Sequence, residues 1–144
     1  MKNLLVVLLL VSIPLISFSN DANEKERIKK VIESAYVDGI FNKSDAQAIK
    51  EGWYFDCDIL IYIPQRDACI KNPAYGFAIR AEKGGKALHP GTTFKIPYIH
   101  VSGYAAIAIV EIYQDGKQIY TDYMNFYKFS DAWKIVTKTY YEHK

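Results

Sequence analysis

The C-terminal stretch TDYMNFYKFSDAWKIVTKTYYEH (121–143) decides the fold, because its side chains alternate in character on both sides of one short turn. Side chains of a strand point to opposite faces with a period of two, so the stretch predicts two antiparallel strands, 118–129 and 133–142. The segments 94–101 and 104–113 show a similar alternation. Together the four segments predict a terminal antiparallel meander.

The turns of the meander set the expected pairing of its strands. Asp-Gly at 115–116 is a typical two-residue hairpin turn, and 130–132 is interpreted as a three-residue turn. This pairing places only uncharged side chains on one face, which we expect to point toward the helices. That face consists of Tyr104, Ala106, Ala108, Val110, Ile112, Ile119, Thr121, Tyr123, Asn125, Tyr127, Phe129, Trp133, Ile135, Thr137, Thr139 and Tyr141. Asp122 and Lys138 are then expected on the opposite, outward face.

Helical patterns precede these strands. Apolar residues recur at helical spacing over 24–41, and a shorter helix is expected over 44–51, ended by Gly52. A strand is expected over 54–63 and another helix over 74–82. Helices first and strands last predict a single α+β domain, residues 20–144.

The first 20 residues, MKNLLVVLLLVSIPLISFSN, have the layout of a secretory signal peptide, with a basic start, an apolar run and small residues before the cut. We expect residues 1–19 to be removed and the mature protein to be periplasmic or secreted. The alternative is an uncleaved membrane anchor, which needs about 20 apolar residues, more than this run contains. No membrane association is expected after cleavage.

Charge and motif content exclude several classes of function. The chain has 18 basic and 16 acidic side chains, whereas a nucleic-acid-binding protein usually shows a basic excess or stripe. The sequence contains no phosphate-binding loop, no metal-ligand cluster and no nucleophile motif, so neither a cofactor nor a metal is expected. Cys57 and Cys69 leave two alternatives open: a disulfide formed in an oxidising compartment, or a buried strand thiol and a free one.

The expected inward face has the composition of a ligand pocket. A core built only to fill space favours Leu, Ile, Val and Phe, whereas this face combines alanines with tyrosines, threonines and an asparagine. Alanines opposite large rings leave room, and buried polar groups orient a ligand. The candidate ligand-binding residues are Tyr104, Tyr123, Asn125, Tyr127, Trp133, Thr137 and Thr139. The alternative is a plain core whose hydroxyl groups reach water or backbone.

The opposite face is expected to carry an apolar centre with charges around it. Its members are Ala105, Ile107, Ile109, Met124, Phe126 and Val136. An apolar patch with a charged rim often marks a subunit contact, so we expect a homodimer through this outer sheet face. The alternative is that the middle segment of the same chain, 65–90, covers the patch.

Two helices, a strand, a variable middle and a terminal meander form the element order of the NTF2-like cone fold, which this chain resembles. The run TDY at 121–123, WKIV at 133–136 with Lys138, and IKKVIESAYVDGIFNKSDAQAIKEGW at 28–53 are similar to the putative lumazine-binding branch, close to the SnoaL-like proteins. The resemblance implies a strongly curved antiparallel sheet that encloses a small-molecule pocket with the opening helix. It also implies a dimer, and a family that includes isomerases, cyclases, dehydratases and non-catalytic binders.

Catalysis in such a pocket would need an acid or base within hydrogen-bond reach of the ligand. The expected inward face has none, which leaves Asp56 or Asp58 as a base and Tyr62 or Tyr123 as a hydrogen-bond donor. His89 and His100 have no carboxylate partner at a fixed spacing. We therefore expect an exported, non-catalytic domain that binds a small, largely apolar or aromatic molecule. The alternatives are a SnoaL-like isomerase or hydrolyase with an Asp base, and a dimeric interaction protein whose pocket is filled.

Overall fold

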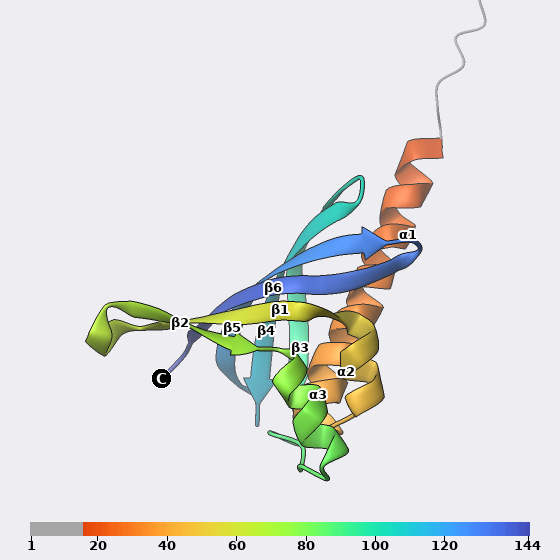
Figure 1. Cartoon of the computed structure of the whole chain (residues 1–144). Coiled ribbons are helices and arrows are strands. Elements are labelled where there is room, and N and C mark those ends of the chain that lie inside the picture. Colours follow the sequence, from red (N-terminus) through yellow and green to blue (C-terminus); the bar gives the residue numbers. More distant parts are fainter. Residues whose placement is uncertain (1–15) are drawn as a thin grey trace, which may run out of the picture.

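The computed structural model describes residues 16–144 (Figure 1). The predicted signal peptide, residues 1–19, lies outside the described residues apart from 16–19. Within the described part, no helix is long and apolar enough to cross a bilayer. Every element predicted for the mature domain falls inside the described range.

A long helix opens the fold. It consists of α1 (Ile16–Val31), which continues into η1 (Ile32–Asn42), a segment with the wider turn of a π-helix. The helix predicted over 24–41 is confirmed. It ends one residue later than predicted, at Asn42, and begins earlier, at Ile16. Most of η1 is buried, because its apolar side chains recur on the side that faces the sheet. These buried residues are Ile32, Ala35, Tyr36, Val37, Gly39, Ile40 and Phe41.

The second helix packs closely on the first. α2 (Ala46–Gly52) has Asp45 as its N-cap, and the Asp45 side chain accepts a hydrogen bond from the Ala48 N–H at 3.0 Å. The helix ends at Gly52, as predicted. A Cβ atom at Gly52 would lie 2.1 Å from the Cβ atom of Ala35, so the close approach of the two helices requires a glycine there.

Six strands form one curled sheet in the order β2-β1-β6-β5-β4-β3. They are β1 (Trp53–Ile63), β2 (Ala68–Pro73), β3 (Thr93–Ser102), β4 (Ala105–Gln114), β5 (Lys117–Phe129) and β6 (Ala132–Glu142). The α+β class is confirmed, but β1 pairs in parallel with β6, so the sheet is mixed and not purely antiparallel. The edge strand β2 is not among the predicted strands.

The helices lie on one side of this sheet (Figure 1). The sheet curls around the long helix, and α2 and α3 (Tyr75–Glu82) lie side by side near the start of β1. The helix predicted over 74–82 is thereby confirmed. The short turn η2 (Pro64–Arg66) joins β1 to β2, and this hairpin projects away from the helices.

The pairing of β5 with β4 differs from the expected pairing by one residue. Tyr113 pairs with Gln118 and Ile112 pairs with Tyr120, so Ile119 is the extra residue of a β-bulge. A one-residue shift turns every following side chain of the strand to the other face. The bulge therefore reverses the two faces of β5 relative to the prediction.

Burial confirms this reversal. β4 keeps its predicted inward face, formed by Ala106, Ala108, Val110 and Ile112. On β5, however, Asp122 and Phe126 are buried, whereas Tyr123, Asn125 and Tyr127 are exposed. The tyrosines and the asparagine expected beneath the long helix are thus on the outer side of the sheet.

A second bulge lies in β6. The turn before it has two residues and not three, and Phe126 pairs with Ile135 while Asn125 pairs with Thr137, so Val136 is extra. Side chains before Val136 keep the predicted face, and those after it are turned to the other face.

The outcome for β6 is mixed. Trp133 and Ile135 are buried on the inward side, as predicted. Beyond the bulge Thr139 is exposed, whereas Lys138 is 4% exposed and its diagonal neighbour Asp122 is 0% exposed. The expectation that this charged pair points outward is wrong, because both side chains lie beneath the long helix.

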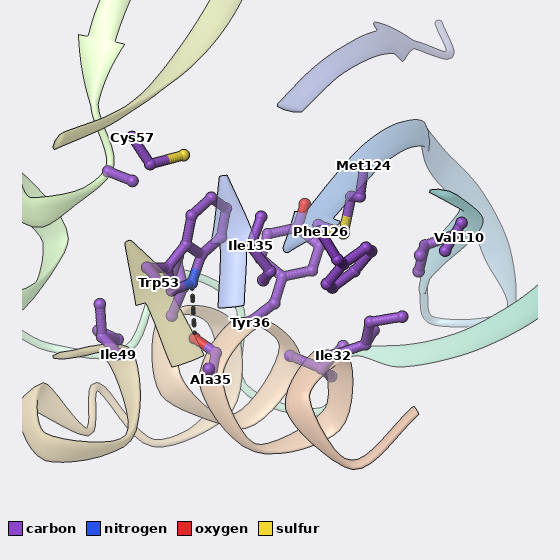
Figure 2. Packing of buried hydrophobic residues seen from close by; sticks show 14 of the residues in the cluster. Ile32, Ala35, Tyr36, Ile49, Trp53, Cys57, Val110, Met124, Phe126 and Ile135 are labelled. Carbon is purple, nitrogen blue, oxygen red and sulfur yellow. Dashed lines mark hydrogen bonds between the residues drawn. The ribbon is translucent and has the colours of Figure 1, made fainter. Parts of the chain in front are cut away.

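The hydrophobic core fills the space between the long helix and the sheet (Figure 2). Trp53, at the start of β1, packs against the helix, and its indole N–H donates to the Ala35 carbonyl at 3.2 Å. Ile32 contributes from η1. Met124 and Phe126, expected in the outer patch, are each 1% exposed and belong to this core.

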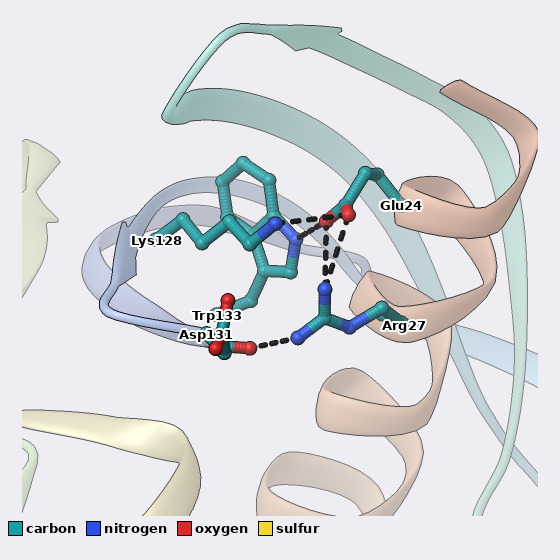
Figure 3. Close-up of polar contacts among 5 residues, drawn as sticks. All are labelled: Glu24, Arg27, Lys128, Asp131 and Trp133. Carbon is teal, nitrogen blue, oxygen red and sulfur yellow. Dashed lines mark hydrogen bonds and ion pairs between the residues drawn. The ribbon is translucent and has the colours of Figure 1, made fainter. Parts of the chain in front are cut away.

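A polar cluster joins the start of the long helix to the β5–β6 hairpin (Figure 3). Glu24 accepts hydrogen bonds from Lys128 Nζ at 2.9 Å, from the Trp133 indole at 2.5 Å and from Arg27 at 3.0 Å. Arg27 also donates to the Asp131 carbonyl. The cluster fixes where the hairpin meets the helix.

Candidate functional site

A cavity of about 120 Å³ lies between η1 and the inner face of the sheet. It is lined by Tyr36, Ile40, Phe41, Ile59, Ile61, Asn72, Phe77, Leu88, His89, Tyr120, Lys138 and Tyr140. The residues contributed by η1 are buried at its base, whereas Asn72, Leu88 and His89 are exposed at its rim. The cavity therefore opens to solvent on the side of the segment before β3.

Local structure places the aromatic wall of this cavity. The turn of η1 brings Tyr36 and Phe41, five residues apart, into edge contact with ring centroids 5.1 Å apart. The rim segment is held by backbone hydrogen bonds from Leu88 to the Ile40 carbonyl at 3.2 Å and from His89 to the Phe41 carbonyl at 3.0 Å. The His89 ring stacks on Phe41 at 6.0 Å.

Three polar side chains form a closed arrangement beside the cavity, and we call them the inner triad: Tyr36, Asp122 and Lys138. The Tyr36 hydroxyl donates to Oδ2 of Asp122 at 2.7 Å and accepts from Nζ of Lys138 at 2.9 Å. Lys138 also forms an ion pair with Oδ1 of Asp122. Both oxygens of the carboxylate are thereby engaged by members of the triad.

Burial controls the electrostatics of the inner triad. It raises the pKa of Asp122, although contacts with Lys138 and Tyr36 partly offset this, and it lowers the pKa of Lys138. Burial and the adjacent carboxylate raise the pKa of Tyr36 well above its usual value. The Lys138 ammonium also lies 4.4 Å from the centroid of the Tyr140 ring, a cation–π contact.

The inner triad presents one of its groups to the cavity as a charged donor. Lys138 and Tyr36 line the cavity, and Asp122 does not. An ammonium has three N–H groups, and two of those on Lys138 donate to the other triad members. The arrangement therefore offers a ligand a hydrogen-bond donor, while it keeps the carboxylate away from the cavity.

The predicted ligand-binding residues do not line this cavity. Tyr123 and Tyr127, at 49% and 53% exposure, lie on the outer side of the sheet with Asn125. Tyr104, at 73% exposure, occupies the turn between β3 and β4. The bulge at Ile119 is the physical reason for the error on β5.

The remaining predicted ligand residues lie on β6. Thr139 is exposed and Thr137 is half-buried, because the bulge at Val136 turns them outward. Trp133 faces inward as predicted, but its N–H is bonded to Glu24 at the far end of the long helix from the cavity. The prediction of an inward polar face made of these residues is therefore wrong.

The predicted catalytic candidates are also outside the cavity. Asp56 is exposed, and Asp58, opposite Thr137, is in an ion pair with Lys71 at 3.1 Å. Tyr62 is exposed and its hydroxyl donates to a neighbouring carboxylate in the hairpin at 3.0 Å. The predicted base and donor therefore do not meet a pocket.

The two histidines differ in their positions. His89 stands at the cavity rim, whereas His100 is exposed on β3 and pairs with Ile107 on the outward face. No group of three or more histidine, cysteine or carboxylate side chains that could hold a metal ion exists in residues 16–144.

The cysteines are not joined by a disulfide. Cys57 is buried on β1, Cys69 is exposed on β2, and both are free. Cys69 pairs with Tyr62, five positions along β1 from Cys57, which at about 3.3 Å per residue separates the two by roughly 16 Å. A disulfide needs Cα atoms within about 7 Å. Burial raises the pKa of the Cys57 thiol to about 12, so this thiol is unreactive.

The outer face of the sheet, which faces away from the helices, is rich in exposed aromatic and uncharged side chains. We define it by Tyr98, His100, Ile107, Tyr123, Asn125, Tyr127 and Thr139. Two hollows of about 360 and 220 Å³ lie on it. Of the apolar centre predicted there, Ile107, Ile109 and Val136 are found on this side, but Met124 and Phe126 are not.

Sequence reasoning missed the inner triad, although one signal was visible. Asp122 and Lys138 are diagonal neighbours in the predicted pairing as well as in the observed one. Opposite charges at neighbouring positions of adjacent strands are compatible with burial as an ion pair, which the rule that charges face solvent does not anticipate. Tyr36 gave no signal, because an aromatic residue on the inner side of a helix also suits a plain core.

Comparison with known proteins gives the family and the fold. A sequence model described as "putative lumazine-binding" matches residues 23–141. An NTF2-like protein of unknown function from Shewanella baltica has a TM-score of 0.69 and 21% identity, over 85% of this chain and 96% of that chain. An NTF2-like protein of unknown function from Silicibacter pomeroyi has a TM-score of 0.68 and 18% identity, over 85% and 98%. A comparison with curated proteins finds no match.

Proposed function

This chain belongs to the putative lumazine-binding family of NTF2-like proteins, and on that premise we propose that it binds a small, largely apolar or aromatic molecule in the cavity between η1 and the sheet. The observation that carries the proposal is the cavity itself, which has a buried aromatic base, an exposed rim and one charged group. Ligand sites are typically concave and mostly apolar, with few polar groups that fix orientation.

The volume limits how much of a ligand is enclosed. The cavity measures about 120 Å³, and an engineered apolar cavity of about 150 Å³ in another protein holds benzene. One ring therefore suits the enclosed part. A larger ligand would extend past Leu88 and His89 into solvent.

Binding is favoured over catalysis by the positions of the carboxylates. Proton transfer requires a base within hydrogen-bond reach of the ligand. Neither Asp56 nor Asp58 lines the cavity, and Asp122 has both oxygens engaged by the inner triad. An Asp-dependent isomerase or hydrolyase would need one of these groups to be free at the cavity.

We also propose that the protein is exported. The support is the signal-peptide layout of residues 1–19, with its basic start, short apolar run and small residues before Asn20. Mass spectrometry of the protein from its own host would give the mature N-terminus. A chain that retains Met1 would contradict the proposal.

We further propose that two copies meet through the outer face of the sheet. Exposed aromatic side chains are enriched at such contacts, and the centre of this face, around Ile107, Tyr123 and Asn125, is lined by uncharged side chains. Ile107→Lys, at 45% exposure in the centre of this face, should shift the mass measured by light scattering toward a monomer. Ile79→Lys, at 41% exposure on α3, is the matched control and should change nothing. A monomeric wild type would exclude this interface.

The ligand proposal is tested by filling the cavity from β1. Ile61 lines the cavity. The side chain of its neighbour Leu60 points to the outer face of the sheet, as does that of Thr139, the β6 residue that pairs with Leu60. Ile61→Trp should abolish binding of α-methylstyrene, measured by ligand-observed NMR, whereas Leu60→Trp should retain it. A wild type that does not bind this probe, or an equal loss in both variants, would contradict the proposed site.

A further inference from the structure

Lys138 is the charged group that the cavity places next to its ligand. Its side chain is 5% exposed, and among the described lining residues it is the only Lys, Arg, Asp or Glu. Two of its N–H groups are used within the inner triad, and an ammonium has a third. A ligand in the cavity therefore meets a donor that is fixed in position and already charged.

The charge of this donor is compensated before any ligand enters. Asp122 is 0% exposed, and one of its carboxylate oxygens forms an ion pair with Lys138. The other carboxylate oxygen accepts a hydrogen bond from the Tyr36 hydroxyl. The inner triad as a whole is therefore close to neutral. A second anion in this place would lose its own hydration without a free cation to balance it.

We propose that, within the function proposed above, the cavity selects neutral ring compounds that carry a carbonyl oxygen, with the third N–H of Lys138 donating to that oxygen. A carbonyl gains a charge-assisted hydrogen bond without bringing a charge into a buried place. The rings of Tyr36, Phe41 and Tyr140 hold the apolar part of the compound.

Three probes of nearly equal shape test this selection in the wild-type protein. Acetophenone carries a neutral carbonyl, benzoate replaces its methyl group by a second oxygen and a negative charge, and α-methylstyrene replaces the oxygen by a carbon. Acetophenone should bind about ten-fold more tightly than α-methylstyrene, the ratio that one hydrogen bond to a charged group gives. Benzoate should bind at least about ten-fold more weakly than acetophenone, because its charge is desolvated without compensation.

Asp122→Asn sharpens the test, because it removes one negative charge and keeps the shape of the side chain. Lys138 then carries an uncompensated positive charge beside the cavity. The preference should reverse, so that benzoate binds more tightly than acetophenone. Glu24→Gln also replaces a carboxylate by an amide, but in the polar cluster between α1 and the β5–β6 hairpin. It should leave the order of the three affinities as in the wild type. Circular dichroism shows whether each variant is folded, and the wild-type series decides if Asp122→Asn does not fold.

The outcomes separate this inference from the proposed function. If α-methylstyrene binds and acetophenone binds no better, the cavity is a ligand site but Lys138 does not select carbonyl compounds. Tighter binding of benzoate to the wild type would also overturn the inference. If none of the three probes binds, the proposed function itself fails. Acetophenone as the tightest of the three, with reversal in Asp122→Asn, would support both.

Discussion

Two carboxylates join the long helix to the sheet, each with one lysine and one aromatic donor as partners, but their pKa values shift in opposite directions. Burial tends to raise the pKa of Glu24, but its contacts with Lys128, Trp133 and Arg27 together lower it. At Asp122 burial is the largest cause and the pKa is raised, despite two hydrogen bonds. The two pKa values shift in opposite directions because Glu24 has a second cation, Arg27, beside it and keeps partial access to solvent, whereas Asp122 is fully buried.

The difference teaches what each cluster contributes. The Glu24 cluster lies at the β5–β6 turn, where partly exposed charges keep some hydration, so its hydrogen bonds add to stability. The inner triad has given up nearly all hydration, and a buried ion pair often stabilises no more than apolar side chains of the same size. A costly pair retained beside a cavity supports a role in ligand selection rather than in stability.

The largest expected effect comes from breaking the inner triad at one member. Lys138→Met should lower the free energy of unfolding by about 3–5 kcal/mol, because it leaves Asp122 buried without its counter-charge. Urea denaturation followed by tryptophan fluorescence measures the change. Lys134→Met is the matched control, since Lys134 lies in the same strand, half-buried, and donates only to backbone carbonyls. A loss below about 1 kcal/mol for Lys138→Met would show that the pair is not effectively buried.

Removing all three polar groups of the inner triad should recover much of the stability that Lys138→Met loses. The triple variant Tyr36→Phe, Asp122→Leu, Lys138→Met leaves no buried charge and no unpaired hydroxyl. It should be more stable than Lys138→Met alone by about 2–3 kcal/mol. A triple variant no more stable than the single one would mean that the polar contacts themselves hold the helix on the sheet.

Two neighbouring strands, β4 and β5, show how far the sequence could predict the fold. The inward face of β4 was predictable because one set of positions, 106, 108, 110 and 112, is wholly apolar. On β5 both sets contain large rings, and only one contains charges, so the charge pattern favours the wrong face. Nothing in the local sequence marks Ile119 as the bulged residue that reverses the strand.

The candidate site was predictable only in outline. Helical spacing located the long helix, and the element order indicated a cavity between that helix and the sheet. The lining residues could not be predicted, because they depend on two single-residue bulges and on a rim segment, Leu88 and His89, held by backbone hydrogen bonds. Contacts of this kind leave no periodic pattern.

A smaller effect is expected when the charge of the Glu24 cluster is removed. Glu24→Gln should lower the free energy of unfolding by about 2 kcal/mol, since three charge-assisted hydrogen bonds are weakened but their donors retain some access to water. Glu26→Gln, on the exposed side of the same helix and paired with Lys29, is the control and should cost less than about 1 kcal/mol. Equal losses in the two variants would show that the cluster is an ordinary surface ion pair.

The smallest effect is the pH dependence of that difference. The folded pKa of Glu24 is lowered, so its contribution is fully present above the unfolded value, about 4.3, and is lost as the pH falls through the folded value. The stability gap between wild type and Glu24→Gln should therefore be constant near neutral pH and shrink as the pH falls below about 4.3. Urea denaturation of both proteins at several pH values measures the gap. A gap that widens on acidification would mean that burial outweighs the contacts with Lys128, Trp133 and Arg27. The folded pKa of Glu24 would then be raised, like that of Asp122.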